Sequence, residues 1–390
     1  MKTLACAALA VCLCAGPAIA TAETTHEQFE QQVRNTLAPV IGKSVTGLKV
    51  LHVSADLGPW LDTGMQVKPG EPVTVVLSGK AWLSRHYDIS LEAPLQLWRR
   101  IGTDGPITRN VRNTDTFEPS HAGTLQLKNL PTRWLDASGA YAGTPGAASA
   151  DAGGGVSVAL IRWAPGSNVA SELAALAGEA AAPTWVAAEV TRPKTLVAPP
   201  DGWRYLWELG PAEIFSARSS DGSDGGPASR IDAHTRNDVA ILQHDVSVPL
   251  EAGTTLQWSW KVNQLPARSA EDTAIGHDYL SIAVEFDNGQ DLTYLWSRQL
   301  PQGHHFKCPL EGWHDRETHV VARTGPAELG KWLAESRDIM ADYAKTIGGP
   351  APARITRVWL IANSVFGRGE GHAQFGDIRL GKEGERIQVW

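Results

Sequence analysis

Hydrophobic and polar residues alternate with a period of two in several segments of the chain. In the clearest segment, residues 254–262, one face carries Leu256, Trp258, Trp260 and Val262. Residues 279–287 repeat the pattern, with the apolar positions Leu280, Ile282, Val284 and Phe286. Successive side chains of a strand point to opposite faces, so each segment predicts a strand with one buried face. Similar segments at 48–53, 73–77, 124–130 and 156–161 extend this to an all-β prediction of two β-sandwich domains.

Two segments have helical periodicity instead. Residues 24–37 contain an N-capping Thr and place Phe29, Val33 and Leu37 on one face, which predicts a short N-terminal helix packed on the first sheet. Residues 329–347 place larger apolar side chains on a stripe, namely Leu329, Trp332, Leu333, Met340, Tyr343 and Ile347. We expect this second helix to lie against the second sandwich.

The predicted strands fall into two groups, and the 38 glycines and 24 prolines lie mostly in the turns between them. An Ala- and Pro-rich stretch separates the groups and is typical of a linker. We therefore divide the chain into a signal peptide (1–20), an N-terminal helix (21–45), a lectin-like sandwich (46–165), a linker (166–200) and a jelly-roll-like sandwich (201–390).

The first twenty residues have the features of a secretory signal peptide. Lys2 precedes an apolar core, residues 4–13, that is too short to span a bilayer, and residues 18–20 are suited to cleavage. Cys12 and Cys14 follow large apolar residues, so no lipoprotein signal is expected. The mature protein should be soluble, without a transmembrane segment, and periplasmic or secreted, with Cys308 as its one remaining cysteine.

Composition narrows the choice of ligand. The formal net charge is −7 and the basic residues are spread thinly, which argues against a nucleic-acid partner. The 15 tryptophans outnumber the 7 phenylalanines and 6 tyrosines together, and flat aromatic faces are what sugar rings stack on. We therefore expect a glycan or another polar polymer of the cell envelope as the ligand.

Sequence blocks of the second half resemble a family of exported bacterial proteins that carries a domain-of-unknown-function label, number 3047. The blocks, in order, are residues 256–262, 277–279, 285–287, 292–297, 335–338, 342–343 and 376–378. The resemblance implies a jelly-roll-like sandwich similar to carbohydrate-binding modules, and no assigned reaction.

The first half is similar, more faintly, to the small calcium-dependent galactose-binding bacterial lectins. The matching stretches are residues 70–75, 79–82, 100–102, 122–127 and 154–158. The lectins' calcium ligands would fall at residues 148–152, where Asp151 is the one carboxylate. Calcium takes six to eight oxygen ligands, so backbone carbonyls and water would have to supply most of them here. We carry over the fold and not the metal site, and we expect no cofactor, with calcium left as an unsupported alternative.

Histidines form the densest polar cluster of the sequence. His304, His305, His314 and His319 are candidate metal ligands, although a solvated loop around Trp313 is the favoured interpretation because their spacing matches no metal motif. Cys308 would be a nucleophile if His304 or His305 stabilised its thiolate, whereas burial would make it structural, which we favour.

The candidate binding site is predicted from side chains that share a strand face. A groove formed by Lys261, Tyr279, Glu285, Tyr294 and Trp296, with Trp313 in a nearby loop, is the predicted glycan site, without catalysis. The first alternative is a glycoside hydrolase or polysaccharide lyase that uses Glu285 and Asp278 as acid and base. The second is a structural adaptor of the envelope that presents sheet edges to other proteins.

Overall fold

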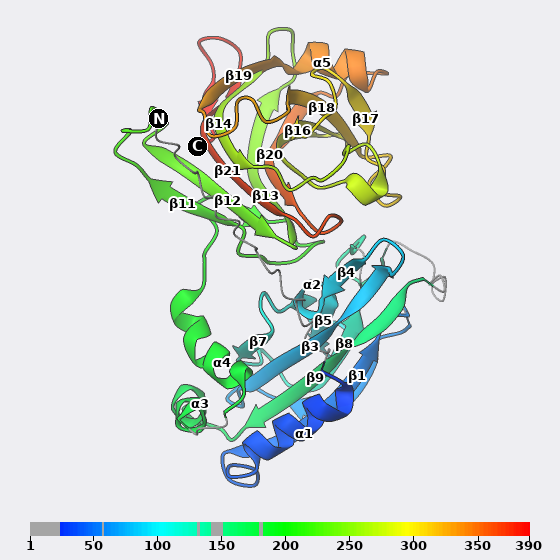
Figure 1. Ribbon diagram of the computed structural model, residues 1–390, viewed down its shortest axis with the longest axis vertical. Coiled ribbons are helices and arrows are strands. Elements are labelled where there is room, and N and C mark those ends of the chain that lie inside the picture. Colours follow the sequence, from blue (N-terminus) through cyan, green and yellow to red (C-terminus); the bar gives the residue numbers. More distant parts are fainter. Residues whose placement is uncertain (1–23, 57, 131–132, 142–150, 179–181) are drawn as a thin grey trace, which may run out of the picture.

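The protein consists of two lobes, each a sandwich of two β-sheets (Figure 1). The computed structural model describes residues 24–390, except 57, 131–132, 142–150 and 179–181. The all-β prediction is confirmed, while the predicted signal peptide lies outside the described residues. Among the described helices, none has the length and apolar character needed to cross a bilayer.

The first sandwich pairs a five-stranded sheet with a four-stranded sheet. The five-stranded sheet has the order β1 (Val45–Ser54), β9 (Gly153–Trp163), β3 (Val73–Ser84) and β4 (Ile89–Glu92), and β7 (Thr114–Phe117) also pairs with β3. The four-stranded sheet has the order β2 (Leu61–Val67), β8 (Gly123–Asn129), β5 (Leu97–Ile101) and β6 (Thr108–Arg109). Alternate residues of these strands, such as Val75, Leu127 and Val158, form the core between the sheets.

Helices cover the outer face of the five-stranded sheet. Helix α1 (His26–Leu37) begins at Thr25, which forms a capping box with Gln28, and it buries Phe29, Val33 and Leu37 as predicted. The stretch expected to be a linker contains α3 (Val169–Ala177) and α4 (Thr184–Thr195), whose apolar residues share one cluster with α1. Much of that stretch is therefore packed on the first lobe, because its apolar side chains contact the outer face of the five-stranded sheet beside α1. A short helix, α2 (Ala93–Gln96), connects β4 to β5.

The second sandwich pairs a seven-stranded sheet with a six-stranded sheet. The seven-stranded sheet has the order β10 (Arg204–Tyr205), β13 (Val239–Pro249), β20 (Arg354–Asn363), β15 (Tyr279–Phe286), β16 (Asp291–Ser297), β18 (Glu317–Thr324) and β17 (His305–Lys307). The six-stranded sheet has the order β11 (Phe215–Ser219), β12 (Ser229–Arg236), β21 (Glu370–Gly381), β14 (Thr255–Gln264) and β19 (Leu333–Asp338), and β22 (Ile387–Gln388) pairs with β21. Strands β16 and β18 run parallel, an exception to the antiparallel pairing of the two sheets.

The predicted inward faces of β14 and β15 are confirmed, but the two strands lie in opposite sheets of the sandwich. Strand β14 alternates between buried and half-buried residues over most of its length, as expected for a sheet with one covered face. Strand β15 is buried on both faces. Its second face, with Tyr279 and Ala283, packs in a separate apolar cluster with residues such as Leu206 and Trp359. The prediction of one buried face was therefore wrong for β15.

The long helix predicted at residues 329–347 is a strand followed by a short helix. Residues 333–338 form β19, which pairs with β14, and Asp338 then caps α5 (Ile339–Thr346) through the amide of Ala341. Gly330 ends the preceding turn at a φ of 76°. Pairing with β19 gives hydrogen-bond partners to the backbone groups along the edge of β14. This gain outweighs the helical spacing of the apolar side chains in residues 333–338.

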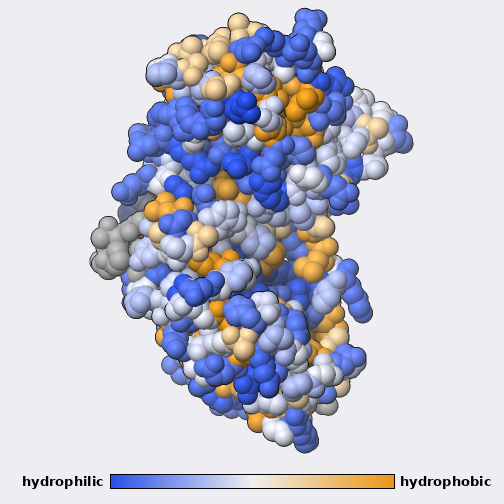
Figure 2. All heavy atoms as spheres, turned by 180° about the vertical axis from the view of Figure 1, so that it is seen from behind, coloured by the Kyte–Doolittle hydropathy of each residue, from blue (hydrophilic) through white to orange (hydrophobic). Residues whose placement is uncertain are grey.

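Arginines of the first lobe connect it to the second. Arg112 binds Glu213 at 2.7 Å, and Arg133 binds Glu208 at 2.9 Å and donates to the carbonyl of Gly312 at 2.8 Å. The surface in Figure 2 is mostly hydrophilic, with hydrophobic atoms in separate patches on both lobes. The two lobes therefore contact each other through charged side chains and backbone groups.

Candidate functional site

The groove predicted from strand faces does not form. Tyr294 and Trp296 are fully buried between the two sheets, where their rings pack against Trp258 and Trp260 at 5.6 and 5.3 Å between centroids. Lys261 lies on the opposite sheet, so it cannot share a surface with them. The prediction was wrong because β16 points Tyr294 and Trp296 into the sandwich, whereas Leu295 faces the outer side.

The carboxylates proposed for catalysis have separate structural partners. Glu285 binds Arg357 at 2.7 Å and Arg316 at 3.4 Å, while Asp278 accepts hydrogen bonds from the backbone amides of Phe366 and Gly367. Burial raises the pKa of Asp278 to about 6 against the opposing effect of these amides. Lys261 binds Asp224 at 2.8 Å and not Glu285. Glu285 therefore belongs to ion pairs of the sheet, and Asp278 caps the loop at residues 366–367.

Tyr279 and Trp313 line a cleft of about 590 Å³ between the lobes. Its walls are mainly apolar, with Leu83 and Leu91 from the first lobe facing Ile241 and Phe366 from the second. The ring of Trp313 lies 4.9 Å from the guanidinium carbon of Arg133. Both predicted residues therefore face the interlobe cleft.

Only one of the four candidate metal-binding histidines lies in a cluster of potential ligands. His319 is buried beside His277, Cys308 and Glu317, whereas His304 lies 3.7 Å from Asp272 and His305 is exposed. His314 lies outside this group, and its Nδ1 donates to the backbone carbonyl of Cys308 at 3.0 Å.

Cys308 is fully buried, in agreement with the structural interpretation favoured from the sequence. Burial, with the nearby Glu317 carboxylate, raises the pKa of its thiol well above the ordinary value. Its partner is His277, at 3.3 Å, and not His304 or His305. A free nucleophilic thiolate is therefore not supported.

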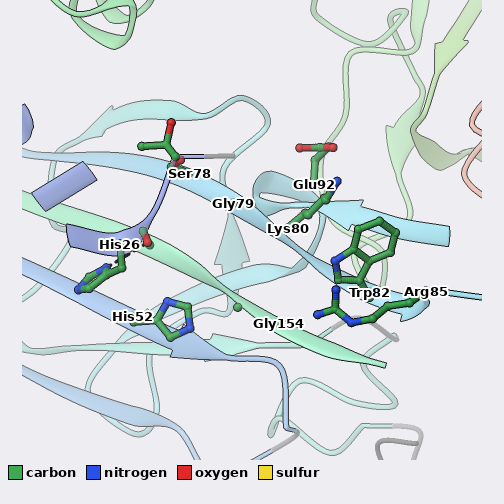
Figure 3. A pocket seen from close by; sticks show the side chains of 12 residues that line it. His26, His52, Ser78, Gly79, Lys80, Trp82, Arg85, Glu92 and Gly154 are labelled. Atoms are coloured by element: carbon green, nitrogen blue, oxygen red, sulfur yellow. Dashed lines mark hydrogen bonds between the residues drawn. The ribbon is translucent and has the colours of Figure 1, made fainter. Parts of the chain in front are cut away.

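A second site lies on the first lobe, beside the N-terminus of α1 on the outer face of the five-stranded sheet (Figure 3). The pocket measures about 400 Å³. Its side chains come from three adjacent strands in register: His52 of β1 lies opposite Ser157 of β9, which lies opposite Ser78 of β3. From the first turn of α1, His26 reaches the Ser157 hydroxyl at 3.0 Å.

Glycines form the floor of this pocket. Lys80 and Trp82 of β3 lie opposite Gly155 and Gly153 of β9. A Cβ at Gly155 would lie 2.8 Å from the carbonyl of Val53 and would also collide with the His52 ring. Gly155 therefore leaves room for the His52 ring, while the backbone at Gly154 is exposed between the flanking side chains.

Positive charge gathers on one side of the pocket around an aromatic ring. The ammonium of Lys80 lies 4.4 Å from the centroid of Trp82, and the guanidinium carbon of Arg85 lies 5.2 Å from it. Glu92, directly opposite Lys80 on β4, is the one carboxylate among the described residues of the lining. Partial burial, followed by repulsion from His26, lowers the pKa of His52, so this ring is mainly neutral at neutral pH.

Asp151, the one carboxylate at the calcium position of the lectin resemblance, organises the rim of this pocket. It accepts hydrogen bonds from the Ser84 hydroxyl and from the amide of His86 at 2.8 Å. The bond from Ser84 lowers the pKa of Asp151, which stays ionised at neutral pH. Asp151 thus holds the loop that carries Arg85. The sequence did not predict this pocket, since its residues are scattered over α1 and four strands.

Residues 218–379 match the model of the family described as "Protein of unknown function (DUF3047)". This confirms the resemblance recognised in the second half of the chain. No curated protein matches the chain.

Solved structures show distant similarity. The xyloglucanase domain of NopAA from Sinorhizobium fredii is 11% identical, with a TM-score of 0.29 over 47% of this chain and 96% of that one. A family 11 carbohydrate-binding module from Clostridium thermocellum is 10% identical, with a TM-score of 0.22 over 46% of this chain and 95% of that one. A carbohydrate-binding module specific for non-crystalline cellulose is 9% identical, with a TM-score of 0.25 over 46% and 88%.

Proposed function

We propose that this protein is an exported, non-catalytic glycan-binding protein, and that the pocket on the first lobe binds acidic segments of a cell-envelope polysaccharide. The observation that carries the proposal is Trp82 flanked by Lys80 and Arg85 beside a glycine floor. An acidic sugar combines a ring with apolar C–H faces, hydroxyl groups and a carboxylate. The pocket offers a complementary group for each of these.

The charge of the pocket supports an anionic ligand. Among the described residues that line the pocket, Lys80 and Arg85 are cationic and Glu92 is acidic, although the whole chain carries a net charge of −7. Attraction to a uronate is therefore local and does not come from the overall field of the molecule. Such attraction between partly exposed groups weakens as salt is added.

The remaining lining groups support recognition of a polar ring. The hydroxyls of Ser78 and Ser157 and the imidazoles of His26 and His52 are able to donate or accept hydrogen bonds. The glycine floor, with Gly154 at a φ of 102°, lets a flat ring approach the sheet closely. Directional polar groups beside an aromatic face are typical of sugar sites.

The proposal is tested by calorimetric titration of the mature protein with soluble polysaccharides. Polygalacturonate and alginate supply uronates, and a mixed-linkage β-glucan supplies neutral sugars. Binding of a uronate polymer that weakens between 50 and 500 mM salt, on the order of tenfold, is the expected result. Equal binding of the neutral polymer would refute the acidic specificity.

Two matched tryptophan variants locate the site. Trp82→Ala is expected to weaken binding by about 1 to 3 kcal/mol, the usual cost of truncating an aromatic contact at an interface. Trp207→Ala is the control, because Trp207 is 41% exposed on the second lobe. An unchanged affinity in Trp82→Ala, or an equal loss in the control, would place the binding elsewhere.

A further inference from the structure

A buried cluster in the second lobe combines the side chains that transition metals prefer. His277 precedes β15, Cys308 follows β17, and Glu317 and His319 lie two residues apart on β18. One ligand atom from each residue lies within 4.8 Å of all the others. None of the four is more than 3% exposed. Three separate segments of the chain therefore bring imidazole, thiol and carboxylate groups to one point.

The neighbours of the cluster orient two of its ligands. Nδ1 of His277 donates to the carbonyl of Glu271 at 2.7 Å, which leaves its Nε2 directed at the Cys308 sulfur, 3.3 Å away. On Glu317, Oε1 accepts from the Tyr279 hydroxyl at 3.0 Å, and Oε2 lies on the side of the cluster, near His319. Such hydrogen bonds to the far side of a ligand are typical of metal centres, where they set the tautomer and the direction of the donor atom.

His319 supplies an independent observation. Its side chain is fully buried, and neither ring nitrogen has a hydrogen-bond partner among the described residues. Its Nε2 lies 3.4 Å from Oε2 of Glu317, without the alignment of a hydrogen bond. Buried polar groups nearly always form hydrogen bonds, so a buried imidazole without one in a group of donor atoms indicates a missing ligand.

We infer that His277, Cys308, Glu317 and His319 bind a tetrahedral zinc ion. Bond lengths of about 2.0 to 2.3 Å around zinc place neighbouring ligand atoms about 3.3 to 3.7 Å apart. The spacings of 3.3 Å from His277 to Cys308 and 3.4 Å from Glu317 to His319 fit this geometry. A thiolate and a carboxylate also balance the charge of a divalent ion in a site from which water is excluded.

The donor set favours zinc over the hard cations. Calcium and magnesium take six or more oxygen ligands, whereas this site offers two nitrogens, one sulfur and one carboxylate. Four protein ligands leave no position open for water, which is typical of a structural zinc site. The ion would tie β18 to the segments before β15 and after β17. His277 and Glu317 also line the interlobe cleft, which gives the ion a route of entry.

Elemental analysis of the mature protein, purified without a metal-affinity step, tests the inference. We expect about one zinc per chain after zinc addition and dialysis, and a melting temperature that falls by several degrees when a chelator removes the ion. Replacement with Co²⁺ should produce the visible bands of four-coordinate cobalt and a sulfur-to-cobalt charge-transfer band in the near ultraviolet. Less than about a tenth of an ion per chain, or a cobalt spectrum without the sulfur band, would overturn the inference.

Variants assign the ligands. Cys308→Ser should abolish the charge-transfer band, whereas the control His305→Gln, at an exposed histidine outside the cluster, should retain both the band and the bound zinc. A band that persists in Cys308→Ser, or is lost in His305→Gln, contradicts the assignment. Should Cys308→Ser fail to fold, competition between the wild-type protein and a chromophoric zinc chelator still decides, because a protein that takes no zinc from the chelator has no such site. The zinc site does not depend on the glycan pocket of the first lobe.

Discussion

Replacement of Trp296 by alanine distinguishes a core role from a binding role. The side chain is fully buried, its ring contacts Trp260, and its indole N–H donates to the carbonyl of Gly325 at 3.0 Å. A buried tryptophan removes about 150 to 250 Å² from water, and its truncation to alanine costs about 3 to 5 kcal/mol. The lost hydrogen bond is part of this cost, at about 1 kcal/mol.

Such a loss is a large part of the 5 to 15 kcal/mol that stabilises an ordinary domain. Trp296→Phe therefore serves as a milder variant, since it retains an aromatic ring but loses the bond to Gly325. We expect a loss of about 1 to 2 kcal/mol for Trp296→Phe. Trp296→Ala should therefore lower the free energy of unfolding more than Trp296→Phe does, if burial and the hydrogen bond both contribute to stability.

Urea unfolding followed by near-ultraviolet circular dichroism measures the effect. The curve is fitted with separate transitions for the two lobes, because a two-domain chain need not unfold in one step. Trp207→Ala, at the exposed Trp207, is the control and should change stability by less than about 0.5 kcal/mol. A second-lobe midpoint that does not move in Trp296→Ala, together with lost glycan binding, would refute the core assignment and restore the groove predicted from the sequence.

Three further changes test other parts of the structure. Gly155→Ala should destabilise the first lobe by about 1 to 3 kcal/mol in urea unfolding and weaken glycan binding, because the new Cβ meets the backbone of β1 and the His52 ring; wild-type behaviour would contradict the close approach. Arg133→Ala removes bonds to the second lobe, so limited proteolysis between the lobes should become faster than in wild type, and an unchanged rate would show that other contacts hold the lobes together. A hydrogen bond from Arg204, with the charges of two arginines, holds the pKa of Asp245 below its usual range, so its ion pairs stabilise the fold above about pH 4 and are lost as pH falls through the lowered pKa. Asp245→Asn should therefore lower the free energy of unfolding by less than about 1 kcal/mol at pH 7. In melting curves below pH 4 the difference between the variant and the wild type should shrink, and a larger difference there would refute the reasoning.

Strand faces were the part of the fold most open to prediction. Apolar residues with a period of two have one arrangement in a strand, so the inward faces of β14 and β15 followed from their sequences. The same pattern does not reveal what covers the other face. Tyr279 and Glu285 are buried because a second apolar layer and two arginines from distant segments lie over them.

The candidate sites were harder to predict for a related reason. His277 and His319 are 42 residues apart, and the pairing of β15, β16 and β18 brings them together with Cys308. The sequence analysis chose His304, His305 and His314 because histidines are dense in that segment. Which side chains meet to form a metal site depends instead on strand register. The pocket on the first lobe likewise depends on where the N-terminus of α1 lies on the five-stranded sheet.

The sequence by itself determined the all-β class, the short N-terminal helix and the inward faces of β14 and β15, because local periodicity is enough to decide which of these side chains must leave water. Only the tertiary structure decided that residues 333–338 form a strand, that Trp296 lies in the core, and which polar side chains meet. Edge pairing, sheet order and the packing of the lobes are interactions between segments far apart in the chain, and no local pattern contains them.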